Sequence, residues 1–128
     1  MAEIPAILTK VNKPGGDPSS MSDLEKKHVP VIEAPDSVAA GQEFQVTVHV
    51  GKLLKHPNEA EHHIEFIDLY KGYVWLGRAS LAGITTEPKV TFNVKLYPEI
   101  AQGDNVLRAY EKCNIHGVWE GTKAVEVK

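Results

Sequence analysis

The chain has 128 residues, 42% of them hydrophobic and 7% aromatic, an ordinary composition for one folded domain with its own core. A net charge of −3 gives no general reason to expect a nucleic-acid partner, and no apolar run approaches the roughly 20 residues of a membrane-spanning helix. The start of the chain lacks the pattern of a secretory signal, and one cysteine cannot form an internal disulfide, so we expect a cytoplasmic protein.

Residues 1–22 are rich in proline, glycine and serine, which predicts an irregular N-terminal arm. Residues 23–128 then form the folded domain. We expect its first strand over Val29–Ile32 and a second over Phe44–Val50, where apolar and polar residues alternate as in a half-buried strand.

Further strands are predicted over five later segments: Ile64–Tyr70, Tyr73–Leu81, Val90–Leu96, Val106–Cys113 and Lys123–Val127. About seven short strands without sustained helical periodicity favour an all-β antiparallel sandwich. Around Ile64–Tyr70 two inward rows remain open, one through His62, Ile64 and Phe66 and one through His63, Ile67 and Leu69.

Five potential metal ligands come from three parts of the chain: His28, His56, His62, Cys113 and His116. One thiolate with four imidazoles exceeds the donor number of a tetrahedral zinc site and suits a redox metal such as iron or copper. Each motif alone is weak, because a lone cysteine is usually a small core residue and a loop histidine is usually solvated. Neighbours on a strand point to opposite faces, so at most one of His62 and His63 binds, and we expect His63 beside the site or on the surface.

The motifs Lys27-His28-Val29-Pro30, His56-Pro57-Asn58, Glu61-His62-His63-Ile64 and Cys113-Asn114-Ile115-His116-Gly117-Val118-Trp119 together resemble the iron-site motifs of superoxide reductases. The resemblance runs from about His28 to Glu120. With a single cysteine, the chain is most similar to the one-iron, or neelaredoxin, form of that family.

The resemblance implies an immunoglobulin-like β-sandwich with a mononuclear non-haem iron. In the family, four histidines surround the iron in a plane and one cysteine is axial, which here implies His28, His56, His62 and His116 with Cys113. It further implies reduction of superoxide to hydrogen peroxide, with Lys27 as the catalytic lysine. Rubredoxin or a similar small protein would donate the electron, and the chain would form a homo-oligomer, commonly a tetramer.

One position departs from the family pattern. The family has a glutamate directly before the lysine and uses it as sixth ligand of oxidised iron, whereas this chain has Lys26 there and Glu25 one residue farther from His28. We therefore prefer a solvent-derived sixth ligand. The alternative is that the segment loops by one residue and brings the carboxylate of Glu25 to the metal. If the segment is extended, Lys26 faces away from Lys27.

Two other functions are compatible with a β-sandwich that ends in a cysteine and a histidine. A cupredoxin-like electron carrier usually has two histidines, one cysteine and a weak axial methionine. The only methionines, Met1 and Met21, precede the domain, which disfavours copper. A zinc-bound or metal-free binding domain would leave the four histidines unexplained.

Overall fold

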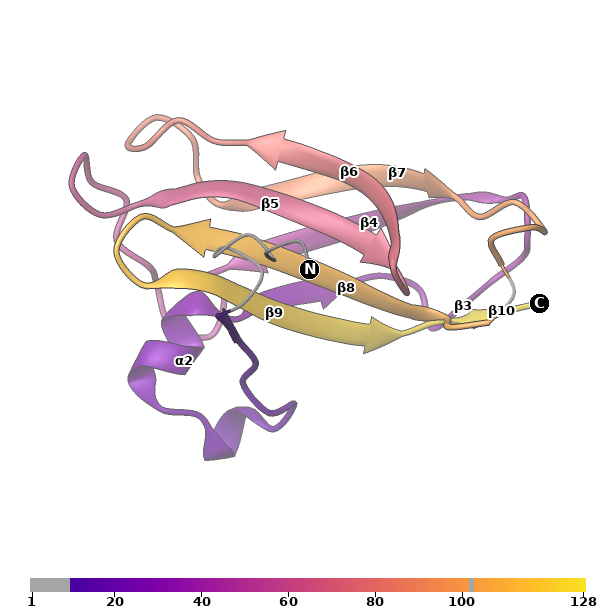
Figure 1. Cartoon of the computed structure of the whole chain (residues 1–128), viewed down its shortest axis with the longest axis horizontal. Helices are drawn as coiled ribbons and strands as arrows, with labels where there is room; N and C mark the ends of the chain where they lie inside the picture. The colour runs from indigo at the N-terminus through magenta and orange to yellow at the C-terminus, as the bar shows by residue number, and fades with distance from the viewer. Residues whose placement is uncertain (1–9, 102) are drawn as a thin grey trace, which may run out of the picture.

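The computed structural model describes residues 10–101 and 103–128 (Figure 1). Residues 1–9, part of the predicted arm, lie outside the described part. The elements in chain order are β1 (Val11–Asn12), a 3-10 helix η1 (Pro18–Ser20), α2 (Asp23–His28), β2 (Pro30–Glu33), β3 (Ser37–Val38), β4 (Glu43–Val50), β5 (Ile64–Lys71), β6 (Val74–Ser80), β7 (Lys89–Lys95), β8 (Val106–Cys113), β9 (Gly117–Ala124) and β10 (Glu126–Val127).

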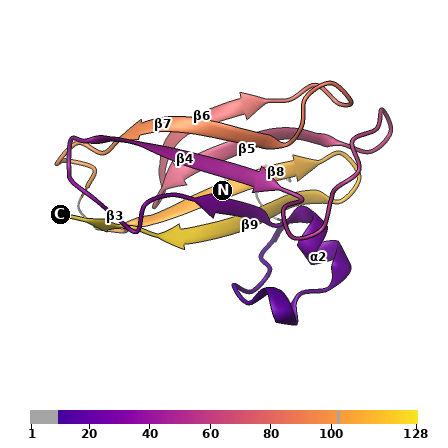
Figure 2. The same ribbon diagram turned by 180° about the vertical axis from the view of Figure 1, so that it is seen from behind.

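Two sheets form the layers of the molecule. One has the strand order β1-β9-β8-β5-β6 and the other β2-β4-β7, while β3 pairs with β10. Figure 2, seen from behind, shows β4 and β7 in front of β5, β8 and β9. The strand pairs are antiparallel except for the two short pairs β1–β9 and β3–β10, which are parallel. The predicted antiparallel β-sandwich is confirmed, and seven of the described strands have four or more residues.

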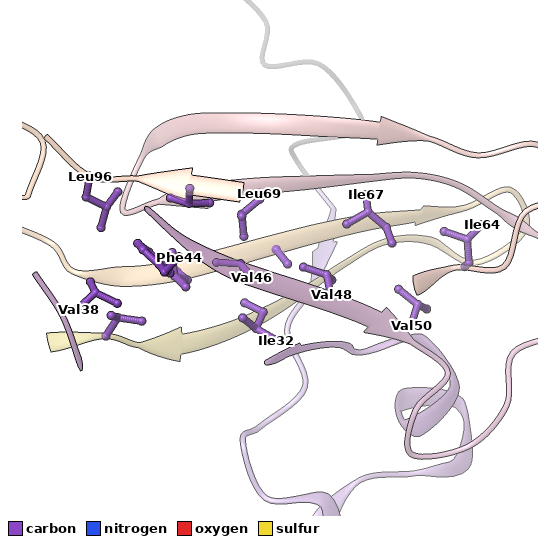
Figure 3. Close-up of a cluster of buried hydrophobic side chains, with 14 of the residues drawn as sticks. Ile32, Val38, Phe44, Val46, Val48, Val50, Ile64, Ile67, Leu69 and Leu96 are labelled. Carbon is purple, nitrogen blue, oxygen red and sulfur yellow. The ribbon is translucent and has the colours of Figure 1, made fainter. Parts of the chain in front are cut away.

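The core lies between the two sheets and follows from the alternation in the strands (Figure 3). In β4, Phe44, Val46, Val48 and Val50 are buried, whereas the residues between them are not. Ile67 and Leu69 of β5 are fully buried against them. Burial of each such side chain contributes roughly 1.5–3 kcal/mol, so this interface holds the sandwich together.

A β-bulge in β5 resolves the two inward rows. The register of β5 against β8 shifts between Ile64 and Phe66. An extra residue in one strand reverses the alternation beyond it. Ile64 is therefore buried together with Ile67, while Phe66 lies under the guanidinium of Arg78, 3.9 Å from its ring centroid. The first row is thus right for Ile64, before the bulge, and the second row is right for Ile67 and Leu69, after it.

The predicted last strand, Lys123–Val127, contains the end of β9 and all of β10, and the prediction missed most of β9. The structure has β9 from Gly117 to Ala124, and β10 contains only Glu126–Val127. Two glycines weaken the strand signal of β9 in the sequence. Both are needed: Gly117 has a φ of +80°, and a Cβ on Gly121 would collide with the carbonyl of Pro30 in β2.

The helix α2 was missed by the sequence analysis, which treated this segment as extended. Ser22 caps it: the N–H of Glu25 donates to Ser22 Oγ at 3.2 Å, and the N–H of Ser22 donates to Glu25 Oε1 at 2.9 Å. This reciprocal capping box starts the helix. The helix ends at His28 because Val29 precedes Pro30, and a residue before proline avoids the helical conformation. Six residues are too few to show helical periodicity.

Two further findings concern the predicted arm and membranes. Within residues 10–22, β1 pairs with β9 and η1 forms one turn, so this part is not wholly irregular. The domain boundary at residue 22 stays a prediction.

No helix within residues 10–101 and 103–128 has the length and hydrophobicity needed to cross a bilayer.

Candidate metal centre

Four of the predicted ligands converge at one end of the sandwich. His28, His56, His62 and Cys113 each offer one ligand atom, and these atoms all lie within 4.8 Å of one another. They come from the last residue of α2, the loop after β4, the segment before β5 and the last residue of β8. Figure 1 shows α2, the β4–β5 loop and the β8–β9 turn at the same end, opposite β3 and β10. The fold thus brings distant donors to one point.

The ring of His28 is held on two sides. Its Nδ1 lies 2.7 Å from the carbonyl oxygen of Leu24, one helical turn earlier, which assigns the proton to Nδ1. The indole of Trp119 stacks on the ring with a centroid distance of 4.8 Å and an interplanar angle of 21°. The Nε2 of His28 consequently carries a free electron pair and belongs to the cluster.

The ring of His56 is also held by a backbone carbonyl. Its Nδ1 lies 2.6 Å from the carbonyl oxygen of Pro57, so Nδ1 donates and Nε2 is unprotonated. The loop can turn here because Gly51 has a φ of +86°, and a Cβ on it would lie 2.8 Å from the backbone nitrogen of His56. Glycine is therefore needed at this position.

The imidazole nitrogens that face one another lack a partner. The two Nε2 atoms of His28 and His56 are 3.2 Å apart, and both are acceptors once each Nδ1 donates to a carbonyl. The Nε2 of His62 is buried without a hydrogen-bond partner among the described residues. Buried acceptors without a donor are costly. A cation between these nitrogens would satisfy them.

Cys113 supplies the sulfur of the cluster from inside the core. Its side chain is 0% exposed, and its Sγ accepts a hydrogen bond from the backbone N–H of His116 at 3.4 Å. Burial raises the pKa of the thiol, while the backbone amides of His116 and Ile115 lower it. A bound metal would displace the thiol proton, because the thiolate is the form that binds metal.

His116 lies at the rim. Its ring centroid is 4.9 Å from that of His28 and 5.1 Å from that of His62, and its Nδ1 is 3.9 Å from Cys113 Sγ. The side chain is exposed, unlike those of His28 and His56, and its ligand atom is outside the group of four. The indole N–H of Trp119 donates to the carbonyl of His116 at 3.1 Å and so fixes this turn.

Burial keeps the imidazoles neutral. It lowers the pKa of His28, His56 and His62, in the case of His56 to about 4. The charge of Lys27 lowers the pKa of His28 and His62 further. Neutral imidazole is the metal-binding form, so these histidines are ready to bind near neutral pH.

The helical conformation of α2 sets the positions of its charged residues. At 3.6 residues per turn, Lys26 lies about 200° around the helix from His28 and Lys27 about 100°. Lys26 therefore lies farther around the helix from His28 than Lys27 does. The sequence analysis also placed Lys26 away from Lys27, but on the basis of an extended segment instead of a helix. The carboxylate of Glu25 accepts the N–H of Ser22, as the capping box requires.

Two buried residues near the cluster have no role predicted from the sequence, although Trp119 belongs to one of the motifs. Trp119 stacks on His28, and Glu111 is 0% exposed with both carboxylate oxygens lacking a hydrogen-bond partner among the described residues. Burial raises the pKa of Glu111 well above its usual range. The alternation of β8 could have revealed Glu111, because it shares the inward row with Ala109 and Cys113.

The donor set fits a redox metal better than the alternatives. At least three imidazoles and one thiolate are available, and a site of this kind suits iron, copper or zinc rather than magnesium or calcium. A blue-copper centre would need only two histidines and usually a methionine, whereas three histidines belong to this cluster. A structural zinc site would leave a fourth histidine at the rim unused.

Comparisons with known proteins show which family and which solved structures this chain is similar to. The desulfoferrodoxin family model matches residues 20–122. The neelaredoxin of Megalodesulfovibrio gigas is 37% identical over an alignment that covers 80% of this chain and 89% of that protein. The superoxide reductase of Pyrococcus furiosus is 35% identical, covering 79% and 90%. The solved structure of a superoxide reductase (neelaredoxin) from Ignicoccus hospitalis has a TM-score of 0.75 and 38% identity, covering 92% of this chain and 95% of that one.

The two adjacent histidines offer a direct test of the cluster. His62→Ala should weaken binding of Fe(II) strongly, because it removes a donor atom of the cluster. His63→Ala is the matched control, since the Nδ1 of His63 faces the carbonyl of Glu59 at 3.1 Å and its ring packs on Gly83. Both affinities can be measured by chelator competition. Iron loss in His63→Ala and not in His62→Ala would reverse the assignment.

The low pKa of His56 predicts a pH effect in the metal-free protein. Its pKa falls from 6.5 to about 4 on folding, so between these values the unfolded chain takes up a proton that the folded protein refuses. Stability is therefore lost as pH falls through this range. Urea unfolding of wild type and His56→Gln should show a wild-type advantage that is larger at about pH 7.5 than at about pH 5. A difference independent of pH would contradict the burial of a neutral ring.

Proposed function

The chain belongs to the desulfoferrodoxin family, and from this premise we propose that it is a superoxide reductase with a mononuclear non-haem iron centre. The observation that carries the proposal is the meeting of unpaired Nε2 atoms of His28, His56 and His62 with the sulfur of Cys113. The substrate is superoxide and the product is hydrogen peroxide. Bound iron supplies the electron in the overall reaction, in which superoxide, one electron and two protons give hydrogen peroxide.

We assign five residues to the iron: His28, His56, His62, Cys113 and His116. The first four are supported by their mutual distances. His116 is supported by its ring contacts with His28 and His62 and by the 3.9 Å between its Nδ1 and Cys113 Sγ. Because its side chain is exposed, the solvent-accessible side of the centre lies at His116.

The protein contributes charge and rigidity to the reaction. One thiolate and neutral imidazoles leave a bound ferrous ion with a net positive charge, and Lys27 adds another positive charge beside His28 and His62. Superoxide is an anion and is attracted by this field. The carbonyls of Leu24 and Pro57 hold two rings in place. These rings need not reorganise when charge moves.

Glu25 is not among the proposed ligands. Its carboxylate is engaged with the N–H of Ser22 in the capping box. To reach the cluster it would have to leave the N-terminus of α2, where a carboxylate is favoured by the exposed N–H groups and the helix dipole. This supports a centre without a carboxylate ligand from this segment.

The remaining parts of the proposal rest on the resemblance. Rubredoxin or a similar small iron protein is the proposed electron donor, and a homotetramer the proposed assembly. A location in the cytoplasm stays a prediction from the single cysteine.

Cys113→Ser tests the iron–thiolate assignment. The oxidised iron protein should show a thiolate-to-iron absorption band in the visible range, because Cys113 belongs to the cluster and is the only cysteine of the sequence. The variant should lose this band and most of its activity toward superoxide. A spectrum unchanged by the substitution would exclude sulfur ligation.

Lys27→Ala should slow the bimolecular reaction with superoxide by about three- to ten-fold at low salt, because a positive charge that attracts the anion is removed. The salt dependence should also become weaker, since such attraction is screened over roughly 8 Å at physiological ionic strength. Lys26→Ala is the matched control and should have a smaller effect. Stopped-flow rates equal to wild type in Lys27→Ala would remove this role.

A further inference from the structure

Asn114 connects the β8–β9 turn to the segment that carries His62. Its Nδ2 donates to the carbonyl of Glu61 at 2.9 Å, and its Oδ1 accepts the N–H of His63 at 2.9 Å. Its backbone N–H also donates to the carbonyl of His63 at 3.1 Å. The side-chain amide therefore binds the backbone on both sides of His62.

This arrangement extends the sheet beyond its last regular pair. The ladder between β5 and β8 ends where Ile64 pairs with Cys113, next to the bulge in β5. The backbone before Ile64 has no regular strand beside it there. A carboxamide offers both a donor and an acceptor, as a peptide group does, so the side chain of Asn114 can replace the missing strand partner.

The backbone groups of His62 itself are occupied from the other side. Its N–H donates to the carbonyl of Glu59 at 3.1 Å, and the N–H of Glu59 donates to the carbonyl of His62 at 2.9 Å. With the bonds of Asn114, the polar backbone groups around His62 are held from two directions. The position of the His62 Cα is thus fixed by hydrogen bonds to the backbone of residues 61–63, from Glu59 on one side and Asn114 on the other.

His62 needs this support more than the two other histidines of the cluster. The rings of His28 and His56 are each held by a carbonyl oxygen. No hydrogen bond holds the ring of His62 within the described residues, and its side chain is only partly buried. The direction of its Nε2 therefore depends on the backbone that carries it.

We propose that Asn114 is a positioning residue of the metal centre, which fixes the backbone at His62 relative to the turn that carries Cys113 and His116. The inference rests on the proposed iron centre. Asn114 acts through His62 and touches no metal. Alanine removes both side-chain bonds, and aspartate retains the acceptor for the His63 N–H but loses the donor to Glu61.

Fe(II) affinity, measured by chelator competition, tests the proposal. Asn114→Ala should bind Fe(II) about ten- to a hundred-fold more weakly than wild type, the usual effect of removing a group that orients a ligand. Asn114→Asp should lie between the two. Asn12→Ala is the matched control, because it also removes a side-chain amide bond to the backbone, at 3.0 Å to the Val118 carbonyl. The control should bind Fe(II) like wild type.

A double mutant separates positioning from a general loss of structure. If Asn114 acts through His62, then Asn114→Ala should weaken iron binding in wild type but have little further effect in a His62→Ala background. Additive effects would overturn the proposal, as would wild-type affinity in Asn114→Ala and Asn114→Asp. If Asn114→Ala fails to fold, the same comparison is made with Asn114→Asp. A wild-type protein that binds no Fe(II) would instead overturn the proposed function.

Discussion

The structure depends most on one electrostatic constraint: imidazole nitrogens with free electron pairs face one another in the interior without a proton donor to satisfy them. The Nδ1 atoms of His28 and His56 donate to carbonyls, so their Nε2 atoms face each other at 3.2 Å as acceptors. The buried sulfur of Cys113 and the unpaired Nε2 of His62 complete the group. Such a cluster is unfavourable in a protein interior unless a cation occupies it. The iron is thus part of the stability of this end of the sandwich as well as of its chemistry.

The surrounding fold can be understood as the means of bringing these donors together. The capping box and Pro30 limit α2 to one short helix that ends at His28. The bulge in β5 turns Ile64 inward, and Asn114 continues the pairing to the segment of His62. Gly121 allows β2, which directly follows α2 in the chain, to approach β9 closely. Trp119 then links His28 to the turn of His116.

Much of this could be predicted from the sequence, and the failures have physical causes. The alternation in Phe44–Val50 and Val106–Cys113 predicted β4 and β8, because one face of each strand is buried. The start of β9 was not predicted because glycine has a low strand propensity. Gly117 is needed for its positive φ, and Gly121 for the close approach of β2. The bulge in β5 reverses the alternation of buried and exposed residues, so the sequence of this strand shows no continuous period of two. The side-chain bonds of Asn114 join residues that are far apart along the chain, so no local pattern reveals them.

A superoxide reductase only reduces its substrate, whereas a dismutase would also oxidise superoxide to oxygen. The most direct measurement mixes the reduced iron protein with a limited amount of superoxide and quantifies hydrogen peroxide and oxygen together with the oxidation of the protein. We expect one hydrogen peroxide for each superoxide consumed, one oxidised centre for each peroxide, and no oxygen. Evolution of oxygen with half as much peroxide, while the iron stays reduced, would exclude a reductase.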